Sequence, residues 1–166
     1  MESAGNRHAG PAFGLSGGSV MAETLREATS DVEVLACWPV MRELRPHLTE
    51  AATFAERVRR QQRDGYRLLA AWEHGAVVGL AGWRVLETLI RGRFCYVDDL
   101  VVRADARRGG LGARLLDGVA EAARALGLPH LVLDTGIDNV LGQRFYFRHG
   151  MLPGALRFAM PIEAAP

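Results

Sequence analysis

The sequence predicts an α/β fold in which a mixed central β-sheet carries helices on both faces. Two strand-like segments, residues 66–72 and 76–86, flank a turn at residues 73–75, and this arrangement predicts an antiparallel hairpin. Further along, a strand, a helix at residues 110–127 and another strand follow one another, and such a crossover joins parallel strands. Antiparallel and parallel pairing in one chain together predict a mixed sheet.

The segments before the hairpin predict a strand and two helices. Residues 24–28 have the pattern of a first strand. Residues 31–44 have helical periodicity, and we expect Pro39 to interrupt this helix because proline lacks a backbone N–H donor. We expect Thr49 to cap a second helix that continues to about residue 64.

The segments after the hairpin alternate between strand and helix. A longer strand at residues 93–102 precedes the helix at 110–127. A short strand at 130–134, a helix at 139–149 and a last strand at 155–162 follow it. The helix at 110–127 is the most clearly patterned element, and its apolar stripe consists of Leu111, Leu115, Leu116, Val119, Ala123 and Leu126.

Size and composition limit the kinds of function that the chain can have. Its 166 residues, of which 49% are apolar, suit one globular domain. Basic residues number 20 and acidic residues 19, so the charge balance argues against a nucleic-acid or anionic-membrane partner. The two cysteines stand apart and the five histidines are scattered, so we expect no metal site. No apolar run approaches the ~18 residues of a membrane span, and we expect a cytoplasmic protein.

The N-terminal residues differ in composition from the rest of the chain. Residues 1–20 are rich in Gly, Ser and Ala without periodicity, and we expect them to form a disordered tail. Residues 21–166 then form the single domain. Either Met1 or Met21 is compatible with this division as the true start.

The segment with the clearest chemical meaning is the glycine-rich loop ahead of the helix at 110–127. Glycines let the backbone approach a ligand closely, and the start of the helix presents free N–H groups and a positive dipole end. Together with the two arginines at the entry, these features predict an anion site suited to phosphates. The sequence Gly112-Ala113-Arg114 excludes a Walker loop, and Leu115 stands where a dinucleotide-binding fingerprint needs its third glycine. The alternative is a turn that merely begins a helix.

Several motifs in order make the chain resemble the GNAT superfamily of N-acetyltransferases. Arg107-x-x-Gly110-x-Gly112 fits the family's Gln/Arg-x-x-Gly-x-Gly/Ala loop, and residues 98–102 fit the strand just upstream. Asn139 fits the Asn that opens the following helix. The run at residues 145–151 fits the family's Phe-Tyr…Gly-Phe ending, with Met in place of the last Phe. The resemblance extends over residues 66–151.

The resemblance implies a role for each matching residue. The backbone of Leu100, Val101 and Val102 would pair with the pantetheine arm of acetyl-CoA, which Asn139 would also contact. Tyr146 would protonate the departing thiolate. The loop that would hold the pyrophosphate consists of Arg107, Arg108, Gly109, Gly110, Leu111, Gly112 and Ala113. Acetyl-CoA is then the co-substrate, and no metal takes part.

The residues themselves leave two of these roles with alternatives. Tyr146 could be a core aromatic, but a phenol is a suitable general acid and its offset from Asn139 favours the catalytic reading. An amine nucleophile also needs a base. The resemblance implies two candidates: Asp98, in a strand similar to that of polyamine-type acetyltransferases, and Asp134, at the end of the next strand, where some family members carry a glutamate base. Asp98 and Asp99 face opposite sides of an ideal strand, so at most one lines the cleft unless a bulge intervenes. Either candidate could instead be a solvated strand end.

The expected function is transfer of an acetyl group to a primary amine, either a small cationic amine or a protein amino group. The competing expectation is a domain that binds acyl-CoA as a sensor without turnover. The pair Asp98 and Asp134, together with Tyr146, favours the enzyme. The sequence does not identify the acceptor, and it leaves open whether the protein forms a homodimer.

Overall fold

The computed structural model describes residues 23–162, so the predicted tail at 1–20 lies outside the described residues. Within that range the chain forms strands, α-helices and one short 3-10 helix, η1. In chain order these elements are β1 (Thr24–Glu27), α1 (Asp31–Leu44), α2 (Ala51–Arg63), β2 (Arg67–Glu73), β3 (Ala76–Thr88), β4 (Gly92–Val102), η1 (Ala104–Ala106), α3 (Leu111–Ala125), β5 (Leu131–Leu133) and α4 (Val140–Arg148).

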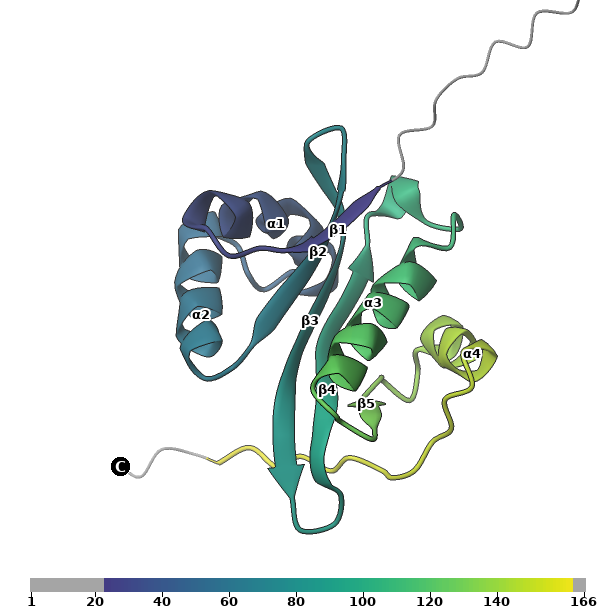
Figure 1. Ribbon diagram of the computed structural model, residues 1–166. Coiled ribbons are helices and arrows are strands. Elements are labelled where there is room, and N and C mark those ends of the chain that lie inside the picture. The colour runs from purple at the N-terminus through teal and green to yellow at the C-terminus, as the bar shows by residue number, and fades with distance from the viewer. Residues whose placement is uncertain (1–22, 163–166) are drawn as a thin grey trace, which may run out of the picture.

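The strands form one five-stranded sheet in the order β1-β2-β3-β4-β5. All neighbours pair antiparallel except β4 and β5, which are parallel. Helices α1 and α2 cover one face of the sheet, and α3 covers the other (Figure 1). The predicted mixed sheet with helices on both faces is therefore confirmed.

Two apolar clusters hold these layers together. One joins α1 and α2 to the sheet and includes Phe54 and Leu80. The other joins α3 to the opposite face and includes Trp83 and Leu115. The predicted stripe of α3 is buried except for Leu126, which is 44% exposed because it caps the helix end rather than continuing it.

Helix α1 corrects one prediction, because it continues through Pro39 without interruption. Pro39 and Leu35, whose carbonyl would have accepted the missing N–H, both lie on the exposed side of the helix, so no buried group is left unpaired. A capping box between Ser30 and Glu33 fixes the start of α1. The next helix, α2, is capped by Glu50 rather than by the predicted Thr49, without a side-chain hydrogen bond.

The prediction of a last strand at residues 155–162 is wrong. In the described structure this segment has no ladder partner and passes across the end of the sheet as an extended strap (Figure 1). Apolar and other residues alternate along it, which produced the prediction, but a strand also needs a neighbouring backbone edge. The apolar side chains of this segment are largely exposed: Leu156, Phe158, Met160 and Ile162.

Candidate active site

Strands β4 and β5 separate at the centre of the molecule. Residues 95–97 of β4 pair with Leu131–Leu133 of β5, whereas the β3 ladder continues along β4 to Val102. Among the described residues, segment 98–102 therefore has ladder partners only on its β3 side. Its other edge has no ladder partner, although Arg107 binds the Val102 carbonyl there, and an extended ligand can bind to this edge in the manner of an added strand.

The glycine-rich loop lies between the end of β4 and the start of α3. Gly110 has φ +79° and caps α3 in the left-handed conformation, which glycine adopts without strain. No side chain caps this helix, and its first turn contains no acidic residue. The N–H groups of residues 107–113 form no hydrogen bond to another described residue. These N–H groups and the helix dipole make the loop a suitable anion site.

Several of the predicted cofactor residues have their side chains engaged within the protein. Arg107 donates from Nε to the carbonyl of Val102 over 2.9 Å and from Nη2 to Glu43 over 3.0 Å. Its guanidinium thus ties the loop to β4 and α1. The side chains of Val101 and Leu111 are buried in the core, so these two residues offer a ligand only their backbone.

A β-bulge places Asp98 and Asp99 on the same face of the sheet. Gly82 pairs with Asp99 and Trp83 with Val97, so Asp98 has no partner and the alternation of faces is broken there. In an ideal strand Asp98 and Asp99 would face opposite sides, but because of this bulge both carboxylates face the same side.

The two carboxylates have different neighbours. Asp98 accepts a hydrogen bond from Nε of Arg84 over 2.8 Å, and burial raises the pKa of Asp98 although Arg84 opposes this shift. Asp99 accepts from Nε of Arg45 and from the hydroxyl of Tyr66, each over 2.9 Å. Burial and the nearby Asp99 raise the pKa of Tyr66 well above its ordinary value, so this hydroxyl stays a donor. Asp98 thus lines one pocket, whereas Asp99, which is bonded to Arg45 and Tyr66, lines another.

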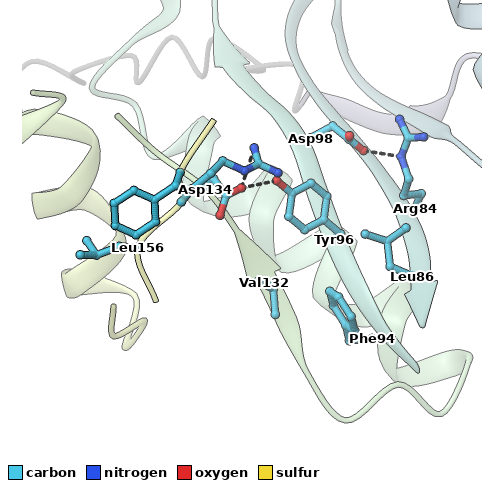
Figure 2. A pocket seen from close by; sticks show the side chains of 10 residues that line it. Arg84, Leu86, Phe94, Tyr96, Asp98, Val132, Asp134 and Leu156 are labelled. Atoms are coloured by element: carbon cyan, nitrogen blue, oxygen red, sulfur yellow. Dashed lines mark hydrogen bonds and ion pairs between the residues drawn. The ribbon is translucent and has the colours of Figure 1, made fainter. Parts of the chain in front are cut away.

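The pocket beside Asp98 has a volume of about 630 Å³ and also contains Asp134 (Figure 2). Asp134 accepts a hydrogen bond from the hydroxyl of Tyr96 over 2.6 Å and forms an ion pair with Arg157 at 2.7 Å. Burial and the bond to Asp134 raise the pKa of Tyr96 to about 12. Both predicted bases therefore line one pocket. Its apolar lining consists of Leu86, Phe94, Val132, Leu156 and Phe158.

Helix α4 carries the two remaining predicted residues. Asn139 caps this helix by accepting from the N–H of Gly142 over 3.0 Å, and its amide donates to Thr135 over 3.0 Å. Tyr146 is half-buried, and burial raises its pKa, so its phenol stays protonated at neutral pH. The neighbouring Phe145 packs beside Gly112, at 3.5 Å from the point where a Cβ would stand. Contacts of Asn139 and Tyr146 with a cofactor stay predictions.

Sequence reasoning missed three polar residues of the pocket: Arg84, Tyr96 and Arg157. Tyr96 stands two residues before Asp98 on the same strand, and this spacing was the available signal. Arg84 belongs to β3 and becomes a partner of Asp98 only through sheet register. Arg157 lies in the segment that was wrongly predicted as a strand, and nothing local indicates its ion pair with Asp134.

Within residues 23–162 no three His, Cys, Asp or Glu side chains cluster as metal ligands would, and no helix there is long and apolar enough to cross a membrane.

The fold and this site define an acyltransferase-like protein, and comparison with known proteins gives the family. The profile of the acetyltransferase (GNAT) family matches residues 33–151. An uncharacterized N-acetyltransferase, YhdJ, of Bacillus subtilis (strain 168) is 32% identical over 123 residues, which are 74% of this chain and 86% of that protein. The chain therefore belongs to the GNAT family and is an acetyltransferase.

One further relative and two solved structures are also similar to this chain. A protein of Azospirillum brasilense named IAA acetyltransferase is 33% identical over 104 residues, 63% of this chain and 61% of that protein's length. A ribosomal-protein-alanine N-acetyltransferase from Brucella melitensis biovar Abortus 2308 has a TM-score of 0.72 at 20% identity, covering 85% of this chain and 100% of that one. The aminoglycoside N-acetyltransferase AAC(6')-Iy, solved in complex with CoA, has a TM-score of 0.69 at 14% identity with the same coverage. These structures share the fold.

Proposed function

We propose that this acetyltransferase uses acetyl-CoA as co-substrate and transfers the acetyl group to a primary amine. One observation carries the proposal: the edge of β4 at residues 98–102 that has no ladder partner leads directly to the free N–H groups at 107–113. An extended arm that ends in a pyrophosphate matches this succession, because the arm can pair with the strand edge while its phosphates meet the helix start.

The proposed binding mode assigns each part of acetyl-CoA to a segment. The pantetheine arm pairs with the backbone of residues 100–102, and Asn139 contacts it from α4. The N–H groups of residues 108–113 hold the pyrophosphate, and Gly110 allows the phosphates to approach the backbone closely. The thioester then lies near the bulge at Asp98, where the pocket begins.

The proposed chemistry forms one C–N bond and breaks one C–S bond. The neutral amine attacks the thioester carbonyl, and Asp98 or Asp134 accepts the proton that the nitrogen loses, directly or through water. Because its pKa is raised, Asp98 is a stronger proton acceptor than an ordinary aspartate. Tyr146 gives its proton to the thiolate as the C–S bond breaks, and its raised pKa keeps that proton in place beforehand.

Solved structures of similar fold support an amine acceptor. One AAC(6')-Iy structure, similar to this chain at a TM-score of 0.73 and 15% identity, contains the bisubstrate analogue CoA-S-monomethyl-acetylneamine. The competing proposal is a domain that binds acyl-CoA without turnover. The pocket with two carboxylates beside the open strand edge favours an enzyme, since a sensor has no need of an acceptor pocket.

Thiol release from acetyl-CoA in the presence of a panel of amines tests the proposal. We expect release that depends on both the protein and an amine. Thermal stabilisation by CoA without amine-dependent release would support the sensor instead. No stabilisation by CoA would refute both proposals.

A further inference from the structure

The floor of the 630 Å³ pocket changes from polar to apolar along the sheet. On β4 the residues Asp98, Tyr96 and Phe94 line the pocket in succession, so the row extends about 13 Å. On β3, Arg84 pairs with Tyr96 and Leu86 pairs with Phe94. Figure 2 shows Asp98 at one end of this row and Phe94 at the other, with Tyr96 between them.

The polar end is the end at which the proposed chemistry takes place. Asp98 adjoins the segment 100–102 that the proposed function assigns to the pantetheine arm. An acceptor nitrogen that reaches the thioester therefore lies at the Asp98 end, and the rest of the acceptor extends toward Leu86 and Phe94. The direction of the pocket thus determines which part of the acceptor meets apolar side chains.

The charges that line the pocket are already balanced. Asp98 pairs with Arg84 at 2.8 Å, and Asp134 pairs with Arg157 at 2.7 Å. The described lining contains no further charged side chain, so two carboxylates face two guanidiniums. No surplus carboxylate is present at the distal end to receive a second ammonium group of the acceptor.

Apolar side chains at the mouth of the pocket are left largely uncovered. Leu156 is 72% exposed and Phe158 is 88% exposed, both on the strap at residues 155–162. Leu86, at the rim formed by β3, is 36% exposed. An apolar ligand that enters the pocket covers these side chains and removes them from water, which favours binding.

We propose that the acceptor is a primary amine with a single positive charge and an apolar body, such as an alkyl chain or an aromatic ring. The amine lies at the Asp98 end, and Leu86, Phe94 and Leu156 contact the body. This inference rests on the proposed function and narrows its acceptor. A polyamine is disfavoured because its second ammonium would be desolvated against Leu86 and Phe94 without a partner.

A pair of acceptors that differ only in the second charge tests the inference. Hexylamine and 1,6-diaminohexane have the same chain length, and the initial rate of thiol release from acetyl-CoA gives kcat/KM for each. We expect a preference for hexylamine of about tenfold or more. Equal use of the two amines, or a preference for the diamine, would overturn the inference.

A matched pair of variants locates the preference in the pocket. Leu86→Asp places a carboxylate at the distal end, and we expect the preference to shift at least about tenfold toward the diamine. Leu89→Asp makes the same change on a fully exposed residue of the same hairpin, outside the pocket lining. We expect it to leave the preference unchanged. An unchanged preference in Leu86→Asp, or an equal shift in both variants, contradicts the placement.

Saturation-transfer NMR on the CoA-bound protein separates this inference from the proposed function. Stronger transfer to hexylamine than to the diamine supports the inference, whether or not thiol is released. Preferential binding without thiol release would refute the proposed catalysis alone. Thiol release from both amines at equal efficiency would refute the inferred acceptor class alone.

Discussion

Asp98 and Asp99 are adjacent in the sequence, yet their carboxylates lie on the same face of the sheet. The bulge opposite Gly82 and Trp83 removes the alternation between them. Asp99 is bound by Arg45 and Tyr66, whereas Asp98 pairs with Arg84 at the pocket. Each carboxylate is thus held by partners of its own, and Asp98 lines the pocket that the proposed function assigns to the acceptor.

Substitution of Asp98 tests its role as the base. We expect Asp98→Asn to lower kcat by about tenfold or more while the affinity for CoA stays unchanged. A base must be deprotonated, so wild-type activity falls as the pH drops through the raised pKa of Asp98, above the ordinary aspartate value. The pH–rate profile of each variant checks this. If the fall in activity at low pH disappears in Asp134→Asn but remains in Asp98→Asn, Asp134 is the base.

Substitution of Tyr146 tests the general acid. Tyr146→Phe keeps the ring and removes the proton that the thiolate would receive. We expect a loss in kcat of about tenfold or more with little change in the KM for acetyl-CoA, because the interaction is made mainly in the transition state. Phe147→Leu, at an exposed position of the same helix, is the control and should retain activity. Full activity of Tyr146→Phe across the pH range would return Tyr146 to a packing role.

A negative charge introduced at the start of α3 tests the proposed pyrophosphate site. We expect Gly110→Asp to abolish measurable CoA binding by calorimetry, because a carboxylate would stand where the N–H groups meet the pyrophosphate. Gly127→Asp is a matched control at the other end of α3, since Gly127 also has a positive φ of 67° and open space around it. Both variants place an aspartate at a positive φ. Retained CoA affinity in Gly110→Asp, or equal loss in both, contradicts the proposed site.

Gly82 is required by the close approach of Tyr66. A Cβ at residue 82 would stand 1.9 Å from the Tyr66 hydroxyl, and the ring of Tyr66 is buried and cannot move aside freely. We expect Gly82→Ala to destabilise the fold by about 1–3 kcal/mol, measured by urea unfolding. Gly109→Ala is the control, because its nearest atom lies 4.0 Å away. A Gly82→Ala protein as stable as wild type would be incompatible with this packing.

Glu33 makes stability depend on pH. Hydrogen bonds from the backbone of Ser30 and from the side chain of Arg26 lower the pKa of Glu33 from 4.5 to about 2. The ionised form is therefore favoured in the folded state, and its contribution is present above pH 4.5 and lost as the pH falls toward 2. We expect Glu33→Gln to have a lower Tm than wild type at pH 7. The difference in Tm between the two proteins should shrink as the pH falls from 4.5 toward 2.

Glu50→Gln is the matched control for that prediction. Glu50 stands at the start of α2, where its side chain makes no capping hydrogen bond. We expect its Tm to follow that of wild type at every pH. A difference at Glu33 that persists below pH 2 would show that the loss comes from packing and not from ionisation.

The sequence alone was sufficient for most of the local elements and for the family. Periodicity located the hairpin β2–β3 and the helix α3 because these signals depend on residues close together in the chain. The loop at 107–113 was recognisable for the same reason: its glycines, arginines and following helix are contiguous. The family assignment followed from contiguous motifs of this kind, and the comparisons confirm it.

Tertiary structure decided which residues line the pocket and whether the C-terminal strap forms a strand. The side of the sheet to which Asp98 points depends on a bulge that arises from the register with β3. The partners of Asp134 are Tyr96, 38 residues before it in the chain, and Arg157, 23 residues after it. The strap has the alternation of a strand but pairs with no strand of the described structure. Local patterns determine which face of an element is apolar, whereas contacts between distant segments determine which side chains meet.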